Sequence, residues 1–248
     1  MAVANKLTKA TPTKSKSVSF MANGMQVELT PEIVRNYMVS GPAKERVSIQ
    51  EIAMFINMCK YSGLNPWLKE AYCIKYGDEM ATMVTGKDAF LKRAEKEPTY
   101  DGFKAGITVI DDSGEVTYRE GAIVMPGETL IGGWAEVFRT DRSHSARIEV
   151  GFEEYANKKK DGTLNQQWKT KPATMIRKVA LVQALKEAFS TTFGGMETAE
   201  ELGQAEPANP GIPAPIMDNT TGEIVNAEIV PQEPNDRPEP VDPGESLI

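Results

Sequence analysis

The sequence is poor in the residues and segments on which several classes of protein depend. Its 248 residues contain two cysteines, Cys59 and Cys73, and one histidine, His144. Two isolated cysteines exclude a disulfide scaffold and a cysteine-rich zinc cluster. A single histidine in a predicted turn gives little support to a catalytic triad or to histidine acid–base chemistry. No apolar run approaches the ~18 residues of a membrane span, so we expect a protein of a reducing, cytosolic compartment.

Several functional motifs are also missing. There is no glycine-rich loop followed by Lys-Ser/Thr, the motif that cradles nucleotide phosphates. The basic N-terminal residues are not followed by an apolar segment, so no secretory signal is expected. No acidic cluster at a predicted strand end indicates a metal site, although the many carboxylates leave a metal-dependent nuclease as an alternative. We predict no catalytic residue, no metal and no cofactor.

Charge is unevenly distributed along the chain. The net charge of −7 combines twelve acidic residues and one basic residue in 196–248 with a net charge of +4 in 1–195. The acidic segment also holds nine of the sixteen prolines, few aromatic residues and no apolar periodicity. We therefore predict a disordered, acidic, proline-rich tail over 196–248. The mildly basic body indicates a polyanionic partner.

The N-terminal region is polar, with four lysines among its first sixteen residues. We predict a disordered basic arm over 1–24 and a folded core over 25–195. A first helix should begin at Thr30 and Pro31, a capping hydroxyl followed by proline at the first helical position.

A second helix should begin at Ser48, because Ser48 and Glu51 form a capping-box pattern. One apolar stripe follows at helical spacing: Ile49, Ile52, Ala53, Ile56 and Cys59. A second apolar line is formed by Met54, Met58 and Tyr61. This second line leaves two alternatives open, a helix buried on two faces or a contact between subunits.

Residues 63–72, with the sequence GLNPWLKEAY, join this helix to the first predicted strand. Gly63 suits the positive φ of a helix end, and the following Asn-Pro pair disfavours helical geometry. Trp67 and Tyr72 place large rings at the start of the sheet, with Lys69 between them. One interpretation is a corner pinned by a buried Trp67. The other adds a ligand-facing edge that presents Lys69.

Alternating apolar residues and turn motifs predict three antiparallel hairpins. Their strand pairs are 70–76 with 80–84, 103–110 with 115–120, and 130–140 with 145–150. Gly132 and Gly133 inside a strand indicate a bulge or a close backbone approach. A helix should open at Gly86 and end at Pro98. Without βαβ alternation, we predict an α+β fold with a mostly antiparallel sheet, flanking helices and one long C-terminal helix.

That longest helix should span about residues 173–189. Its apolar residues cover nearly the whole circumference, so it should pack on several sides. It also carries three basic residues: Arg177, Lys178 and Lys186. Buried cations need partners, because isolated charges are costly to desolvate. Two alternatives stay open: internal carboxylates such as Glu154 and Glu187, or phosphates of a ligand in a groove between this helix and the sheet.

Basic residues interleave with aromatic residues in four segments. The segments contain Trp67, Lys69 and Tyr72; Lys87, Phe90, Lys92 and Arg93; Trp134, Phe138 and Arg139; and Trp168, Lys169 and Lys171. Binders of single-stranded nucleic acid combine a positive groove with rings that stack on or space the bases. The candidate aromatic residues, in structural or base-contacting roles, are Trp67, Tyr72, Trp134 and Trp168.

Five segments occur in the order known from one protein family. Residues 63–72 look like a GLNPW-x-KE-x-Y signature, and Gly86–Phe90 fits a G-x-D-G-W position with Ala and Phe in its last two places. Residues 138–144 are similar to a Y-R-x-D-R-x-H turn. The positions of Trp168, Pro172, Met175 and Arg177, followed by 183–189, match a W-x3-P-x2-M-x-R helix. On these motifs, residues 30–195 resemble the RecT/Redβ family of phage single-strand annealing proteins.

The resemblance implies an ATP-independent recombination protein that is not an enzyme. Such proteins coat single-stranded DNA, assemble into rings or helical filaments and pair complementary strands. The resemblance assigns DNA binding, annealing and self-assembly to the core, 25–195. It assigns contacts with a phage 5′→3′ exonuclease and with the host single-strand DNA-binding protein to the C-terminal region. It also implies a phage or prophage product in the cytosol of a bacterial host.

The resemblance also implies that Lys69, Arg177 and Lys186 occupy positions that are basic in the DNA groove of the family. Together with the basic–aromatic segments, they complete the predicted set of DNA contacts: Lys69, Lys87, Lys92, Arg93, Arg139, Lys171, Arg177, Lys178 and Lys186. Two alternatives to annealing are a passive coat on single-stranded DNA and the metal-dependent DNA-processing enzyme.

Overall fold

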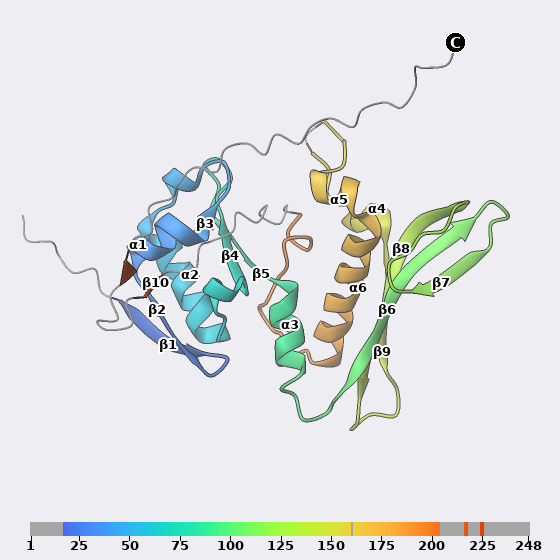
Figure 1. Ribbon diagram of the computed structural model, residues 1–248, viewed down its shortest axis with the longest axis horizontal. Helices are drawn as coiled ribbons and strands as arrows, with labels where there is room; N and C mark the ends of the chain where they lie inside the picture. Colours follow the sequence, from blue (N-terminus) through green and yellow to red (C-terminus); the bar gives the residue numbers. More distant parts are fainter. Residues whose placement is uncertain (1–16, 160, 204–215, 218–223, 226–248) are drawn as a thin grey trace, which may run out of the picture. The chain divides into compact units, whose positions relative to one another are not determined.

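The computed structural model describes residues 17–159, 161–203, 216–217 and 224–225 (Figure 1). The chain divides into two units, Met1–Pro210 and Gly211–Ile248. In the second unit the described residues form one short antiparallel pair, β10 (Ile216–Met217) with β11 (Ile224–Val225). The predictions of disorder for 1–16 and for most of 204–248 lie outside the described residues.

The first unit begins with a hairpin of β1 (Val18–Ala22) and β2 (Met25–Leu29). Alternate side chains of the two strands are buried: Phe20, Ala22, Val27 and Leu29. This alternation is that of a strand with one face on the core. The predicted arm is therefore wrong for residues 18–24, and the fold begins before residue 25.

Both predicted helix starts are confirmed. The next elements are α1 (Pro31–Ile33), the π-helical turn η1 (Val34–Met38), β3 (Val39–Ser40), the 3-10 turn η2 (Lys44–Arg46) and α2 (Ile49–Ser62). Thr30 accepts a hydrogen bond from the Ile33 amide, and Ser48 and Glu51 exchange the two bonds of a capping box. Gly63 ends α2 with a φ of 57°, as a left-handed cap requires.

Helix α2 buries one face in the core. Its inward residues include Ile52, Phe55, Ile56 and Cys59. Met54 and Tyr61, from the second apolar line, are 48% and 81% exposed. Met58, the third residue of this line, is half-buried and packs on the core. Burial of the second line within this chain is therefore wrong for Met54 and Tyr61, and the contact between subunits stays a prediction.

A small sheet follows the corner after α2. The 3-10 turn η3 (Pro66–Leu68) leads into β4 (Ala71–Ile74), which pairs antiparallel with β5 (Thr82–Thr85) and parallel with β3. Helix α3 (Lys87–Ala94) begins directly after β5. The predicted hairpin and the helix opening at Gly86 are confirmed.

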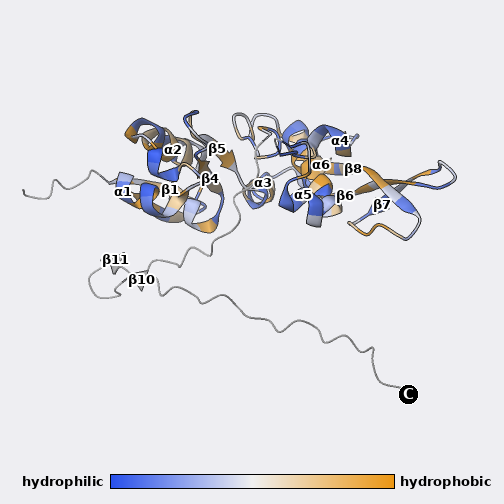
Figure 2. Ribbon diagram, turned by 90° about the horizontal axis from the view of Figure 1, so that it is seen from above, coloured by the Kyte–Doolittle hydropathy of each residue, from blue (hydrophilic) through white to orange (hydrophobic). Residues whose placement is uncertain are grey.

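The second half of the unit is a four-stranded antiparallel sheet with a helix on one face. Its strands are β6 (Tyr100–Asp111), β7 (Val116–Glu120), β8 (Glu128–Arg139) and β9 (Ala146–Gly151), in the order β7-β6-β8-β9. The helices that follow are α4 (Phe152–Tyr155), α5 (Gln166–Thr170) and α6 (Pro172–Ala188). Hydrophobic residues concentrate where α6 lies against β8 (Figure 2). The predicted α+β fold with a mostly antiparallel sheet and a long C-terminal helix is confirmed.

Two glycines let α6 and β9 approach β8 closely. A Cβ at Gly133 would lie 2.7 Å from the Ile176 carbonyl oxygen of α6, and a Cβ at Gly132 would lie 2.5 Å from the Val150 oxygen. The β6–β8 register also shifts next to this point, after the Thr108–Gly132 pair. The predicted close approach and irregularity are therefore both present, and any side chain at Gly133 would push α6 off the sheet.

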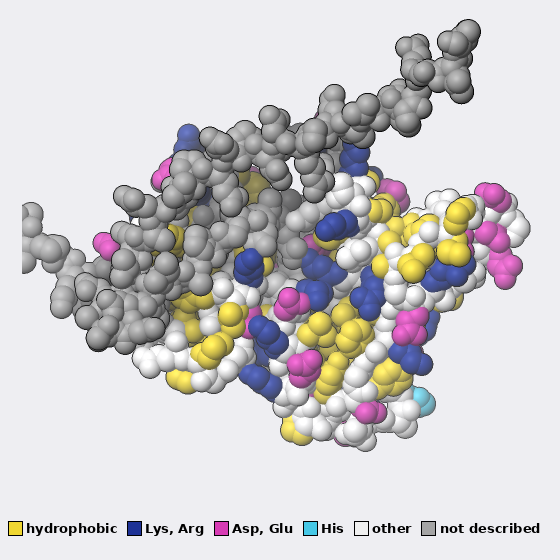
Figure 3. Space-filling view, in the orientation of Figure 1, with side chains coloured by type: hydrophobic (Ala, Val, Ile, Leu, Met, Phe, Trp, Pro, Cys, Tyr) yellow, Lys and Arg dark blue, Asp and Glu magenta, His cyan; other side chains and the backbone are white. Residues whose placement is uncertain are grey.

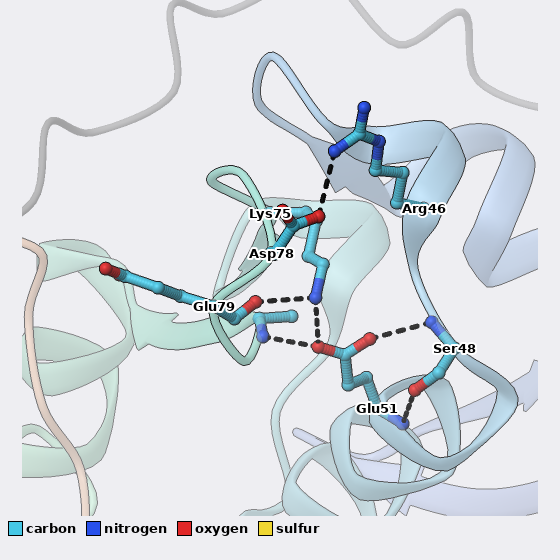
Figure 4. A network of polar contacts seen from close by, with 7 residues as sticks. Arg46, Ser48, Glu51, Lys75, Asp78 and Glu79 are labelled. Carbon is cyan, nitrogen blue, oxygen red and sulfur yellow. Dashed lines mark hydrogen bonds and ion pairs between the residues drawn. The ribbon is translucent and has the colours of Figure 1, made fainter.

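A buried ion pair joins α2 to the end of the β4–β5 hairpin (Figure 4). Lys75 Nζ donates to Glu51 Oε1 at 2.7 Å, and both side chains are less than 10% exposed. The Ala81 amide donates to the same oxygen, and the Ser48 amide donates to Glu51 Oε2. Desolvation alone would raise the pKa of Glu51, but these hydrogen bonds outweigh it and lower the pKa from 4.5 to about 2.

A second buried carboxylate, Glu70, joins three segments. Its side chain is completely buried and accepts hydrogen bonds from the Asn65 amide at 2.8 Å and from Lys92 Nζ at 2.7 Å. The Asn23 side-chain amide, in the β1–β2 turn, donates to both of its oxygens. Glu70 therefore ties the β1–β2 hairpin, the corner after α2 and helix α3 together.

We expect the Glu51–Lys75 pair to make stability depend on acid pH. A carboxyl with a lowered folded-state pKa contributes stability above its unfolded value, and that contribution is lost as pH falls from 4.5 toward 2. At pH 7, Glu51→Gln should lower the free energy of unfolding by about 3–5 kcal/mol, because Lys75 is left buried and unpaired. The difference in free energy of unfolding between wild type and Glu51→Gln, measured by urea denaturation, should be smaller at pH 3 than at pH 7. Glu45→Gln, a control at an exposed residue, should unfold with nearly the wild-type free energy at both pH values. If Glu51→Gln lowers the free energy of unfolding equally at pH 7 and pH 3, this account is contradicted.

We expect Glu70→Gln to destabilise the corner. The substitution keeps the shape, but it removes the charge that pairs with Lys92 and converts one acceptor into a donor. The free energy of unfolding should fall by about 3 kcal/mol, the loss typical of hydrogen bonds to a buried charged group. Urea denaturation followed by circular dichroism measures it, with Glu95→Gln, an exposed carboxylate just after α3, as the control. A Glu70→Gln variant as stable as this control would show that the carboxylate has no such role.

Candidate nucleic-acid site

The corner between α2 and β4 places a lysine in an unusual backbone conformation. Asn65 Oδ1 accepts a hydrogen bond from the Trp67 amide and caps η3 at its N-terminal end. Lys69 ends η3 with a φ of 60°. Among the described non-glycine residues only Asn23 and Lys69 have positive φ. Positive φ is strongly disfavoured for β-branched and bulky residues, and lysine adopts it only with backbone strain. Strained residues of this kind often lie at functional sites.

Gly86 brings the start of α3 against this corner. A Cβ at Gly86 would lie 2.6 Å from the Lys69 carbonyl oxygen and 3.3 Å from the ring of Tyr72. The Gly86 amide donates to the Glu70 carbonyl at 3.1 Å. Only glycine fits this close contact. The contact brings the start of α3 against the corner, so Lys87, the first residue of α3, lines the same pocket as Lys69. The corner and the helix thus present two lysines together.

These residues line a pocket of about 220 Å³ that also reaches α6. Its lining is Leu68, Lys69, Tyr72, Gly86, Lys87, Asp88 and Lys178. Three separate segments therefore contribute one lysine each, beside one aromatic ring and one carboxylate. Asp88 pairs with Lys87 at 2.7 Å. Lys and Arg side chains gather along the middle of the face shown in Figure 3, over α3 and α6, with carboxylates among them.

The pocket suits a phosphate group better than a large ligand. It is smaller than the roughly 300–1,000 Å³ of pockets that enclose drug-sized molecules. Three ammonium groups favour an anion, and a polyanion would gain further by releasing its counterions. The half-buried ring of Tyr72 offers a face for a base or sugar next to the charges. The arrangement can hold a phosphodiester chain and has no evident bond-breaking group.

Two other predicted cations take part in contacts that hold the fold together. Lys92 pairs with the buried Glu70. Arg139 pairs with Asp141 at 2.7 Å, donates to the Ala188 carbonyl at the end of α6 and stacks on Phe189. The sequence pattern alone did not distinguish these contacts from DNA contacts.

Arg177 also anchors α6 to the sheet. Its Nε donates to the Ala105 carbonyl of β6 at 3.1 Å, and it is not part of the pocket lining. Lys171, by contrast, is exposed at the N-terminal end of α6. A contact of either side chain with DNA stays a prediction.

An acidic segment that begins a few residues after α6, residues 196–203, meets the remaining predicted cations. We call it the strap. Lys178 pairs with Glu200 at 3.0 Å and Lys186 pairs with Glu201 at 2.5 Å. Arg93 contacts the sulfur of Met196. Internal carboxylates thus partner Lys178 and Lys186 of α6, but they are not the Glu154 and Glu187 that the sequence suggested.

The strap also corrects the predicted start of the tail. Met196, Thr198, Ala199 and Glu200 are buried, so a tail beginning at residue 196 is wrong for 196–203. Thr198 and Glu201 exchange the reciprocal bonds of a capping box. That Thr-x-x-Glu pattern was readable in the sequence and could have revealed the strap.

The predicted aromatic residues have different surroundings. Trp168 is fully buried against Phe152, with ring centres 5.5 Å apart, and its Nε1 donates to no acceptor within the described part of the chain. Trp134 is 6% exposed and lies under the guanidinium of Arg147. Both therefore have the structural role.

Trp67 and Tyr72 differ from these two rings. Trp67 is half-buried and packs on the core, so the corner is pinned by this ring while Lys69 lines the pocket. The structure thus supports the interpretation of a corner pinned by Trp67, and a ligand-facing role of Lys69 stays a prediction. Tyr72 alone among the four candidate rings lines the pocket.

Other reactive groups take no part in the pocket. Burial raises the pKa of the Cys59 and Cys73 thiols to about 12, which keeps them protonated. His144 is exposed in the β8–β9 turn. Within the described residues, no three His, Cys, Asp or Glu side chains are grouped to hold a metal ion. None of the described helices is both long and apolar enough to cross a bilayer.

Comparison with known proteins identifies the family. The profile of the RecT family matches residues 28–213. An uncharacterized protein of Ureaplasma parvum serovar 3 is 26% identical over 157 residues, which are 63% of this chain and 62% of that protein. The family match covers the corner, α3, the sheet, α6 and the strap. The chain belongs to the RecT family, a family of single-strand annealing recombination proteins.

Proposed function

We propose that this protein binds single-stranded DNA through the lysine pocket and anneals complementary strands without ATP. The observation that carries the proposal is the convergence of Lys69, Lys87 and Lys178, with Tyr72, in a member of the RecT family. Three cations from three segments form a site for phosphate, and no nucleotide-binding loop accompanies them. The protein then acts as a binding and pairing protein and not as an enzyme.

The mechanism follows from electrostatics. Two complementary strands repel each other through their phosphates, and lysines along one strand neutralise part of that charge and release its counterions. Contacts to the backbone carry no sequence information and leave the base edges free. The second strand then pairs with those edges, so base pairing supplies the specificity.

A pocket of about 220 Å³ can take only a short stretch of DNA backbone, so we propose that several subunits act along a strand. Linking weak sites multiplies their affinity without any new contact. The exposed Met54 and Tyr61 on α2 are candidates for the contact between subunits in a ring or filament. Contacts with a phage 5′→3′ exonuclease and a host single-strand DNA-binding protein, in a bacterial cytosol, belong to the same proposal and are assigned to the C-terminal region.

We expect Lys69→Gly to separate binding from folding. Glycine adopts a φ of 60° without the roughly 1–2 kcal/mol penalty of other residues, so stability should be equal or higher. Affinity for an oligo-dT strand should fall. The slope of log affinity against log salt should become shallower by about 0.7 for each phosphate that the variant no longer neutralises.

Fluorescence anisotropy at several NaCl concentrations, with urea denaturation in parallel, measures both effects. Lys87→Gln should also weaken binding, whereas Lys159→Gln removes an exposed lysine outside the pocket lining and should not. If all three variants bind oligo-dT equally well, the pocket is not the DNA site.

We expect the wild-type protein to accelerate hybridisation of complementary oligonucleotides at least about tenfold, a barrier lowered by about 1.4 kcal/mol. A fluorophore–quencher assay without ATP measures the rate. Lys87→Gln should slow it, because phosphate repulsion is then less fully neutralised. Binding without acceleration would show a passive coat, and magnesium-dependent cleavage of labelled DNA would show a nuclease; either result overturns the proposal.

A further inference from the structure

We propose that the strap, residues 196–203, is an autoinhibitory contact that occupies cations of the DNA site and leaves when single-stranded DNA binds. The inference rests on the proposed function and adds a regulatory step to it. Its elements are the ion pairs between the strap and α6, the place of the strap beside the pocket and the incomplete hydrogen bonding of one carboxylate.

The glutamates of the strap pair with lysines of α6 as phosphate groups of DNA could. Glu200 pairs with Lys178 where both side chains are less than 10% exposed. Glu201 accepts hydrogen bonds from Lys186 and from the Gln183 side chain. Carboxylate and phosphate oxygens are both charged acceptors, so the strap satisfies the cations that a DNA backbone would otherwise meet.

The strap also lies at the edge of the pocket. Lys178 both lines the pocket and pairs with Glu200. The Thr85 amide, one residue before the pocket-lining Gly86, donates to the Glu197 carbonyl at 2.7 Å. In Figure 1 the strap is the orange-brown segment between β5 and α6. A strand of DNA that used Lys178 would therefore compete with the strap for the same space and charge.

One feature of the strap lowers the free-energy cost of its release. Among the described residues, none donates a hydrogen bond to the buried Glu200 Oε2. A buried carboxylate oxygen without a donor is unfavourable, because water would have solvated it. Opening the strap hydrates that oxygen, while DNA phosphates take over the ammonium of Lys178. The reciprocal Thr198–Glu201 bonds are local and can survive in the open strap.

The closed strap should weaken DNA binding by a factor equal to the reciprocal of the open fraction. A ligand that binds only the open state has an apparent affinity reduced by the open fraction. Disabling the strap should therefore tighten binding without adding any contact to DNA.

The first test uses the full-length double variant Glu200→Gln/Glu201→Gln, which removes both charges from the ion pairs. Affinity for oligo-dT, measured by fluorescence anisotropy, should rise at least about fivefold, the lower end of typical coupling between sites. The matched control, Glu187→Gln/Glu197→Gln, removes two exposed charges from α6 and the strap and leaves both ion pairs in place. Equal affinity of the double variant and this control overturns the inference.

The second test uses the wild-type protein and so holds even if the double variant fails to fold, which circular dichroism reports. A glutamate-specific protease should cleave after Glu200 and Glu201 faster once saturating oligo-dT is present, at matched ionic strength. Unchanged or slower cleavage at these two sites overturns the inference. Failure of the wild type to bind or anneal DNA would instead overturn the proposed function, so the two failures are distinguishable.

Discussion

The structure depends on a carboxylate placed out of reach of water. Glu70 is fully buried and accepts hydrogen bonds from the β1–β2 turn, from the corner after α2 and from Lys92 of α3. A buried charge is tolerated only when donors surround it, so these three segments must keep their relative positions. The carbonyl of the same residue receives the Gly86 amide, which sets the start of α3. The positions of Lys69 and Lys87 follow from this one residue.

The DNA site that we propose on that corner would work by charge. Lysines from the corner, α3 and α6 surround a pocket of about 220 Å³. The same protein must not hold DNA so tightly, or so indiscriminately, that pairing fails. Carboxylates beside the lysines, Asp88 in the pocket and Glu200 in the strap, moderate the positive charge. Weak, adjustable sites repeated along an oligomer suit annealing better than one strong site.

Much of this fold was predictable, because local signals agree with the global structure. The capping box at Ser48, the left-handed Gly63, the hairpins and the glycine pair at 132–133 were all readable from residue type and spacing. The roles of individual charges were not. Glutamate and lysine are usually exposed, so the sequence alone did not reveal the burial of Glu70 or the Glu51–Lys75 pair.

The boundaries of the core were also misjudged, for a related reason. Residues 196–203 share the acidic composition of the segment that follows them, yet they pack against α6 because Lys178 and Lys186 need partners. Residues 18–22 contain a single polar residue, Ser19, and bury alternate side chains, which the polar composition of 1–24 as a whole concealed. The basic neighbours of Trp168 left a structural and a base-contacting role open, and the ring fills the core against Phe152.

The central claim is that lysines of separate segments act on the same stretch of DNA backbone. A double-mutant cycle between Lys69→Gly and Lys87→Gln tests it most directly, with oligo-dT affinity as the readout. If both lysines share one phosphate, the two losses should be non-additive, with a coupling of at least about 0.5 kcal/mol. Strictly additive losses, or no loss from either substitution in a folded protein, would contradict the account.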